Sequence, residues 1–169
     1  MKRKGRIFQI NCSRGGVPKL AVREASLTTL GIEGDSCAHT DIHGGPNRAV
    51  CLYSLEEILK LQAEGHPVFP GSVGENLTVA GLDWGALQPG MRLALGNEAV
   101  VELTSYTSPC STITASFTGG QFKRISQKVN PGSSRIYARV LHTGRLAVGQ
   151  TVRILDGANG DGAQAIRGT

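Results

Sequence analysis

Short stretches of alternating apolar and polar residues, separated by glycine-rich turns, run through most of the chain. Alternation with a period of two is typical of a half-buried strand, and many short strands at even spacing predict a barrel or a sandwich. The predicted strands cover residues 6–11, 21–25, 49–53, 74–79, 91–95, 99–104, 135–141 and 151–155. The pattern therefore predicts a mainly β fold with a few short helices.

One segment has helical rather than alternating spacing. Ser54 and Glu57 are placed as in a capping box, in which the Ser54 hydroxyl accepts from the Glu57 backbone and the Glu57 side chain reaches back. Gly65 is placed to end the helix in the left-handed conformation. The predicted apolar face comprises Leu55, Ile58 and Leu59. A looser helical stretch is predicted over 112–117, and residues 31–35 are predicted to be a turn.

Two strand patterns predict where polar side chains point. Asn76 falls on the polar face of strand 74–79, and Arg135 and Arg139 fall on the polar face of strand 135–141. Gly96-Asn97 between two apolar runs predicts a hairpin that joins strands 91–95 and 99–104.

Length and composition bound the class of protein. The 169 residues suit one domain over residues 1–155, followed by a tail over 156–169 that is rich in Gly, Ala, Asn and Asp and is expected to be disordered. No apolar run approaches the roughly 20 residues of a membrane span, so a membrane protein is not expected. The basic start Lys2-Arg3-Lys4 leads into a run too short for a signal peptide, which favours a cytoplasmic protein.

The charge balance favours an anionic ligand or partner without identifying it. The chain has 18 Lys and Arg against 13 Asp and Glu, a formal charge of +5. Nucleic acid is not favoured as the partner, because aromatic residues make up 5% of the chain and do not interleave with the basic segments. The basic N-terminus is more simply a solvated end of the chain.

The densest chemistry lies in the run from Asp41 to Arg48. The amides of Gly44 and Gly45 can point at one anionic group, and His43 and Arg48 can reach the same place. The run is therefore an oxyanion or phosphate cradle, or else a Gly-Gly-Pro turn whose side chains face water.

The four cysteines lack CxxC spacing, which favours free thiols in a reducing compartment. Cys12 and Cys51 lie in or beside apolar segments, where cysteine usually acts as a small hydrophobic residue. Cys110 follows Pro109 in a polar loop, so it is the candidate reactive thiol, the alternative being an ordinary loop cysteine.

Two other kinds of site are less well supported. Cys37, His39, His43 and Cys51 lie close enough in sequence for a zinc site, but they lack the paired spacing of a zinc finger. A Ser/His/Asp triad has no Gly-x-Ser-x-Gly elbow to support it.

Several short motifs occur in a specific order and spacing. They are Gly34-Asp35, His43 to Val50, Pro70-Gly71 with Gly74 to Val79, Leu87 to Gly90, and Ser108-Pro109-Cys110. Together they make residues 6–155 resemble the MOSC domain, the C-terminal domain of molybdenum-cofactor sulfurase, in its stand-alone bacterial type. The resemblance implies a β-barrel-like fold related to the small barrel domain of pyruvate kinase, and a molybdenum cofactor in which molybdopterin carries the metal.

The resemblance also implies roles for individual residues. Cys110 would be the catalytic residue and would supply a thiolate to molybdenum, a ligand that suits a transition metal. The residues implied in cofactor binding are Lys19, His43, Gly44, Gly45, Arg48, Glu75, Asn76, Ser108, Arg135 and Arg139, with Lys19, Arg135 and Arg139 placed near the cofactor's phosphate. Phosphate and pterin groups require such donors.

The implied activity is reduction of small N-hydroxylated bases or amidoximes at a Cys-ligated molybdenum. The sequence has no flavin, haem or iron-sulfur motif, so electrons are expected from a separate donor protein. A sulfur carrier with a persulfide on Cys110, and a cofactor-binding or storage protein without turnover, are the alternatives. Larger relatives carry an additional N-terminal barrel over the cofactor; here a second subunit of a homodimer or the loop 117–134 would supply that lid.

Overall fold

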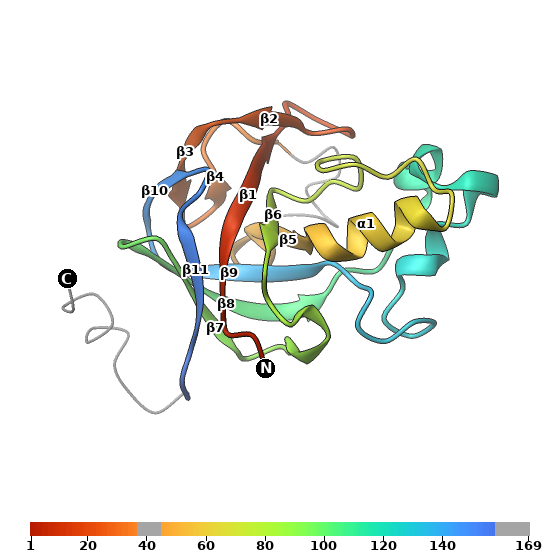
Figure 1. Ribbon diagram of the computed structural model, residues 1–169. Coiled ribbons are helices and arrows are strands. Elements are labelled where there is room, and N and C mark those ends of the chain that lie inside the picture. The colour runs from red at the N-terminus through yellow and green to blue at the C-terminus, as the bar shows by residue number, and fades with distance from the viewer. Residues whose placement is uncertain (37–44, 158–169) are drawn as a thin grey trace.

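The computed structural model describes residues 1–36 and 45–157 (Figure 1). The strands are β1 (Lys4–Cys12), β2 (Leu20–Val22), β3 (Glu24–Thr28), β4 (Gly31–Ile32), β5 (Val50–Ser54), β6 (Leu77–Ala80), β7 (Arg92–Leu95), β8 (Ala99–Tyr106), β9 (Ile136–His142), β10 (Gly144–Ala147) and β11 (Thr151–Leu155). The helices are α1 (Leu55–Ala63) and the short 3₁₀ turns η1 (Pro46–Arg48), η2 (Trp84–Ala86), η3 (Ser111–Ser116), η4 (Thr118–Gly120) and η5 (Phe122–Ile125).

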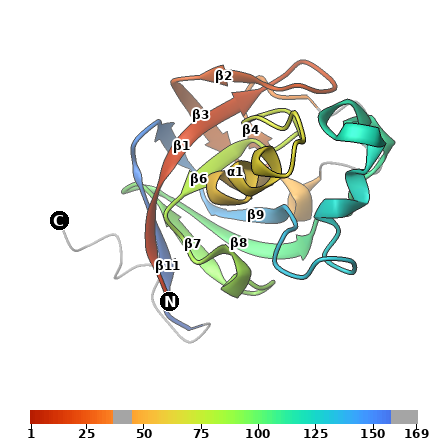
Figure 2. The same ribbon diagram turned by 45° about the vertical axis from the view of Figure 1, so that its right-hand side comes forward.

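Seven strands close into a barrel in the order β11-β7-β8-β9-β5-β6-β1, and β1 pairs back to β11. Lys4 lies opposite Arg153 where the ring closes. The pair β5–β6 is parallel, and α1 follows β5 in the connection between these two strands. Figure 2 shows the strands curving around a common interior. The predicted mainly β, barrel-like fold is confirmed.

Alternate residues of the strands fill the barrel. Ile10, Leu77, Leu52 and Ile136 are aligned across β1, β6, β5 and β9, and each is at most 1% exposed. Burial of a side chain of this size stabilises the fold by about 1.5–3 kcal/mol. Because side chains alternate along a strand, the neighbours of these residues point out of the barrel. That outward row supports the site described below.

The ends of α1 follow the sequence prediction. The Ser54 side chain accepts a hydrogen bond from the Glu57 backbone, and Gly65 has a φ of 95°. The His66 amide donates to the Leu61 carbonyl at 3.1 Å, the six-residue bond of a Schellman motif. The Glu57 carboxylate accepts from Lys60 at 2.9 Å instead of reaching back to the Ser54 backbone, so only the Ser54 half of the predicted capping box is present.

The predicted apolar face of α1 was wrong in one position. Ile58 and Leu61 are buried, whereas Leu59 is 52% exposed. Residues three apart share a helix face, so Leu61 joins Ile58 against the barrel and Leu59 turns toward solvent. The 3₁₀ segment lies beside the C-terminal end of α1 (Figure 1). The Thr118 hydroxyl donates to the Gly65 carbonyl, and Arg124 pairs with Glu64.

A second sheet with the order β10-β3-β4 lies beside the barrel. The sequence predicted a turn over residues 31–35 and no strand over β10, so this sheet was missed. Gly31 explains part of the error: at its φ of 120°, a Cβ would lie 2.3 Å from the Ala49 carbonyl oxygen. The glycine there serves a close approach to the start of β5 rather than a loop.

The predicted hairpin is confirmed, with Leu95 opposite Ala99. The tail prediction falls mostly on residues 158–169, which lie outside the described residues. Within residues 1–36 and 45–157, every helix is too short or too polar to cross a lipid bilayer.

Candidate functional site

The site is built on an outward-facing row of side chains across four barrel strands. The backbone amide of Asn11 donates to the Asn76 carbonyl, and the amide of Asn76 donates to the Cys51 carbonyl, both at 2.7 Å. Cys51 in turn lies opposite Tyr137 in the pairing of β5 with β9. These residues alternate with Ile10, Leu77, Leu52 and Ile136 of the core, which is why they share the outer face.

A cavity of about 370 Å³ lies over Asn76, Cys51 and Tyr137 of this row. The lining residues lie within 16–19, at Leu30, in β4 with Asp35 and Ser36, within 45–49, at Cys51, at Val73, Gly74 and Asn76, within 110–113, and at Arg135 and Tyr137. Ligand cavities usually measure ~300–1,000 Å³, so this one suits a small molecule or cofactor. Ser36 and Gly45, which flank the undescribed segment, both line it.

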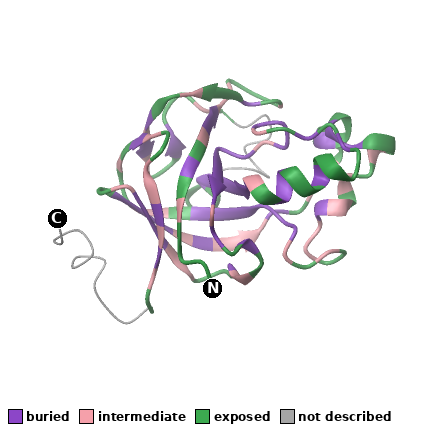
Figure 3. Cartoon of the chain, in the orientation of Figure 1, coloured by how far each residue is buried: buried purple, intermediate pink, exposed green. Residues whose placement is uncertain are grey.

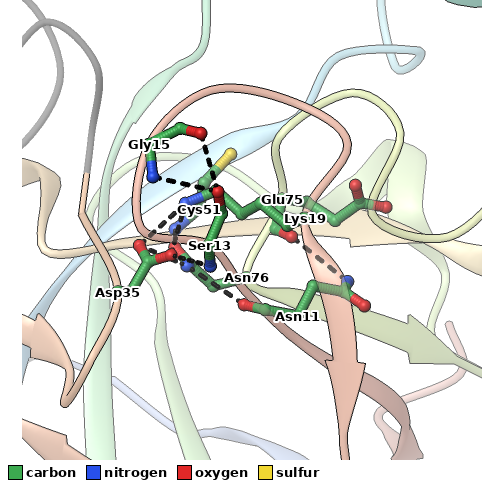
Figure 4. Close-up of polar contacts among 8 residues, drawn as sticks. All are labelled: Asn11, Ser13, Gly15, Lys19, Asp35, Cys51, Glu75 and Asn76. Carbon is green, nitrogen blue, oxygen red and sulfur yellow. Dashed lines mark hydrogen bonds and ion pairs between the residues drawn. The ribbon is translucent and has the colours of Figure 1, made fainter.

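Asp35 is the centre of a buried polar network at the cavity wall (Figure 4). Its carboxylate accepts from the Lys19 ammonium at 2.7 and 2.8 Å, from the Ser13 amide at 2.9 Å and from the Asn76 side chain at 3.0 Å. A buried charge needs a partner and further hydrogen bonds, and Asp35 has both. The charge of Lys19 is therefore largely neutralised within the protein.

Asn76 is held by the strands around it. Its Oδ1 accepts from the Cys51 amide at 3.0 Å, while its Nδ2 donates to Asp35. The side chain thus links β5 to the Asp35 network, and it also lines the cavity.

Arg135 is a buried cation with an unsatisfied donor. It is 6% exposed, and its Nη1 donates to the Val73 carbonyl at 2.6 Å. Its Nε is buried without a hydrogen-bond partner, and no ion pair among residues 1–36 and 45–157 includes this guanidinium. An arginine stays charged in proteins, so a buried one that lines a cavity favours an anion there.

Arg48 lies at the same cavity on an exposed turn. Its Cζ is 5.5 Å from the centroid of the Tyr137 ring, within the range of a cation–π interaction. The Thr104 hydroxyl donates to the Asn47 carbonyl at 2.5 Å, which fastens the turn η1 to β8.

Among residues 1–36 and 45–157, two thiols line the cavity, and they differ in environment. Cys51 is buried, and burial raises the pKa of its thiol, although the nearby charge of Arg135 acts in the opposite direction. Cys110 is half-buried, and its Sγ lies 2.9 Å from the Thr112 hydroxyl. Burial also raises the pKa of Cys12, which does not line the cavity. Cys110 is therefore the more accessible of the two cavity thiols.

The structure brings together Lys19, Gly45, Arg48, Asn76, Cys110 and Arg135 from the predicted set. Ser108 is exposed and does not line the cavity. The predicted residues His43 and Gly44, and the zinc alternative with Cys37 and His39, lie outside the described residues.

Glu75 and Arg139 have partners elsewhere. The Glu75 carboxylate accepts from the Gly71 amide at 3.0 Å and from the Thr78 hydroxyl at 3.2 Å, and its burial raises its pKa to about 7. Arg139 pairs with Glu102 at 2.7 Å on the outer wall of the barrel. Neither side chain lines the cavity.

Sequence reasoning did not assign Asp35, Cys51 and Tyr137 to the site, although all three line the cavity. The motif Gly34-Asp35 was part of the family resemblance, so Asp35 had a signal in the sequence. Tyr137 had no signal, because it appeared as an ordinary strand residue, and Cys51 entered the sequence analysis only in the zinc alternative and as an apolar strand residue.

Comparison with known proteins agrees with the fold and the motifs. The sequence model of the MOSC domain matches residues 39–153. The chain is 34% identical over 142 residues to YflK of Bacillus subtilis, an alignment that covers 83% of this chain and 63% of YflK. It is 27% identical to a protein of Gibberella moniliformis named "Reductase", over 76% of this chain and 23% of that protein.

The crystal structure of YiiM from Geobacillus stearothermophilus has the same fold, with a TM-score of 0.71 and 22% sequence identity over 96% of this chain and 81% of that one. The alignments with YflK and with the reductase cover 63% and 23% of those proteins, so this chain spans less than two thirds of the first and about a quarter of the second. The matched segment includes most of the cavity residues and all the strands from β5 to β10. This chain belongs to the MOSC domain family.

Proposed function

We propose that the cavity binds a molybdenum cofactor and that the protein reduces N-hydroxylated bases or amidoximes. One observation carries the proposal: an accessible thiol, Cys110, and a buried guanidinium with an unpaired Nε, Arg135, line the same cavity. A cofactor with a soft metal at one end and a phosphate at the other requires such a pair of groups.

The residues present fit this group. Arg135 would donate to the phosphate from its guanidinium, and Arg48 would add a second positive charge from the rim. Lys19 contributes less than its charge suggests, because Asp35 already accepts from it. Cys110 would give a thiolate to the metal. When bound, the group would supply two-electron redox chemistry.

The remaining walls would exclude water from the reacting centre. Val17, Leu30, Ile32, Val73 and Ile113 are the apolar residues of the cavity lining outside the barrel strands' row of polar side chains. Such a wall strengthens the hydrogen bonds and charge interactions inside it. It also suits the planar body of a base, with the N–O group directed to the polar side.

The proposed reaction converts R–NH–OH, two electrons and two protons into R–NH₂ and water. The N–O bond breaks, and its oxygen leaves as water after taking up a proton. The chain has no motif for a flavin, a haem or an iron-sulfur cluster, so a separate donor protein would supply the electrons. The likeness to a protein named "Reductase" supports this class of activity.

A sulfur carrier is the second candidate, and the half-buried position of Cys110 favours it to the same degree. In that role Cys110 would take a sulfane sulfur from a donor and hand it to a metal centre. The two candidates differ in what they need: reduction requires electrons and no sulfur donor.

Turnover by the cofactor-loaded protein tests the reductase proposal. With dithionite as reductant and no sulfur donor present, we expect an N-hydroxylated purine to be converted into the amine. A lack of conversion by protein that contains both molybdenum and pterin would contradict the proposal.

A further inference from the structure

Two thiols share the cavity, and the proposed function uses only one of them. Of the three cysteines that the structure describes, Cys51 and Cys110 line the cavity and Cys12 does not. Cys51 lies on β5, which is buried along its whole length (Figure 3). Cys110 is half-buried and lies on the loop between β8 and η3. The same cavity thus contains one deep thiol and one accessible thiol.

The chain tethers the two thiols close to each other. The Cys51 Sγ lies 3.7 Å from the hydroxyl oxygen of Thr107, the buried residue that follows β8. Thr107 precedes Cys110 by three residues, and three residues of fully extended chain span at most roughly 11 Å. A disulfide requires the two Cα atoms to lie within about 7 Å of each other. The path of residues 108–110 therefore decides whether the two sulfurs meet.

The loop that carries Cys110 is held at its ends rather than along its length. The Thr107 amide donates to the Arg135 carbonyl at 2.9 Å, and the Cys110 carbonyl accepts from an amide of η3 at 3.2 Å. Between these two bonds, the backbone amides of Ser108 and Cys110 have no hydrogen-bond partner among the described residues. Backbone without such bonds opens at a low cost in free energy. The loop can therefore carry the Cys110 sulfur toward Cys51 while β8 and η3 stay intact.

The surroundings of the two thiols differ in a way that sets the order of their reactions. An accessible thiol meets a peroxide first, so Cys110 is the one that peroxide oxidises. Burial raises the pKa of the Cys51 thiol, and the nearby charge of Arg135 acts in the opposite direction. Burial protects Cys51 from peroxide, whereas its thiolate fraction still attacks an oxidised sulfur that comes within reach.

We propose that Cys51 and Cys110 are a peroxide-reactive pair that closes a disulfide across the cavity. The Cys110 thiolate attacks hydrogen peroxide, the O–O bond breaks, and Cys110 becomes a sulfenic acid as hydroxide leaves. The Cys51 thiolate then attacks the Cys110 sulfur, the S–O bond breaks, and a second hydroxide leaves. The two hydroxides take up the two thiol protons, so two thiols and one peroxide give one disulfide and two waters. The disulfide keeps Cys110 from further oxidation to the irreversible sulfinic acid.

Peptide mapping tests the pair, because trypsin separates all four cysteines of the chain. Cys12, Cys37, Cys51 and Cys110 fall in the tryptic peptides 7–14, 24–48, 49–60 and 93–123. The full chain, made in a host that lacks the molybdenum cofactor, is treated with hydrogen peroxide, alkylated and digested without reductant. We expect a disulfide between peptides 49–60 and 93–123 of one chain, both in the wild type and in the matched control Cys12→Ala.

The variant Cys51→Ala provides a second arm. Without the second thiol, peroxide should convert Cys110 into the sulfinic acid at least about tenfold faster than in the wild type. The peptide map of the wild type does not depend on this variant, so it decides the question even if Cys51→Ala fails to fold. The inference would be overturned by a wild type without the expected disulfide, by bonds from Cys110 to Cys12, to Cys37 or to a second chain, or by equal rates of sulfinic acid formation.

Cofactor-loaded protein separates this inference from the proposed function, on which the disulfide chemistry does not depend. A metal bound to Cys110 should slow the formation of the disulfide at least about tenfold, because the thiolate is then occupied. Equal rates with and without the cofactor would contradict Cys110 as the metal ligand, whereas the peptide map of the unloaded chain alone decides the thiol pair.

Discussion

The ammonium group of Lys19 lies 2.7 Å from a carboxylate oxygen of Asp35, and less than one-tenth of either side chain is exposed. This pair joins the loop after β1 to the segment after β4, and its acid also accepts from Ser13 and Asn76. The Lys19 ammonium therefore stabilises the fold of the cavity wall. Because Asp35 neutralises most of its charge, its attraction for a phosphate in the cavity is small.

Replacing Lys19 with Met is expected to lower the free energy of unfolding by about 3–5 kcal/mol, because the Asp35 carboxylate stays buried without its cation. Urea denaturation measures this loss. Lys128→Met, at an exposed position, serves as the control and should change stability by less than ~0.5 kcal/mol. The double variant Lys19→Met/Asp35→Asn should be more stable than Lys19→Met alone; a double variant that is less stable would show that the pair is not coupled.

Arg135→Lys keeps a positive charge but removes the Nε donor and the planar guanidinium. We expect the Kd for the cofactor to rise by about tenfold, the size of one charge-assisted hydrogen bond, and the molybdenum content per chain to fall with it. Arg139→Lys is the matched control, since the guanidinium of Arg139 pairs with Glu102 outside the cavity. Equal losses of molybdenum in the two variants would place both arginines near the phosphate, as the family resemblance implied.

Glu75 predicts a pH dependence of stability. Burial raises its pKa to about 7 in the folded protein, above the value of 4.5 for an unperturbed carboxyl. Between these values the folded state holds the proton more tightly, so Glu75 favours folding below about pH 4.5 and loses that contribution as the pH rises through 7.

The measurement is urea unfolding of the wild type and Glu75→Gln at several pH values. The stability of the wild type relative to the variant should fall by roughly 3 kcal/mol from pH 4.5 to 8. A difference that is constant with pH would mean that the Glu75 carboxyl is ionised throughout this range in the fold.

Local patterns in the sequence predicted much of the fold. The capping residue Ser54, the end of α1 at Gly65 and the hairpin at Leu95 and Ala99 each depend on residues close in sequence. The alternation in β9 likewise predicted that Arg135 and Arg139 share a face. Whether each meets a cavity or a wall depends on what packs over that face, which a strand pattern does not contain.

The features that were missed depend on contacts between distant residues. The network around Asp35 joins residues 13, 19 and 76, and no local spacing encodes it. The family resemblance assigned Arg139 to the phosphate, and its ion pair with Glu102 was not predicted because the register of β9 with β8 is set by the barrel. Gly31 looked like a turn residue, because its contact with Ala49 becomes visible only once β4 and β5 are placed.

The cysteines provide a contrast within one chain. Cys110→Ser should abolish reduction of an N-hydroxylated base, since a hydroxyl is a poor ligand for a soft metal. Cys51→Ser buries a hydroxyl beside Thr107 and should cost about 1–3 kcal/mol of stability, with a smaller cost for the half-buried Cys12→Ser. Reduction assays with dithionite, paired with urea denaturation, measure both effects. Full activity of Cys110→Ser would remove that thiol from the chemistry.

Molybdenum and pterin content per chain is the most direct test of the account. The wild type, purified from a host that makes the molybdenum cofactor, is analysed for both by elemental analysis and by fluorescence of the oxidised pterin. We predict near-stoichiometric amounts of metal and pterin in the wild type, and less of both in Arg135→Lys. Folded wild-type protein from such a host that contains neither molybdenum nor pterin would contradict the account.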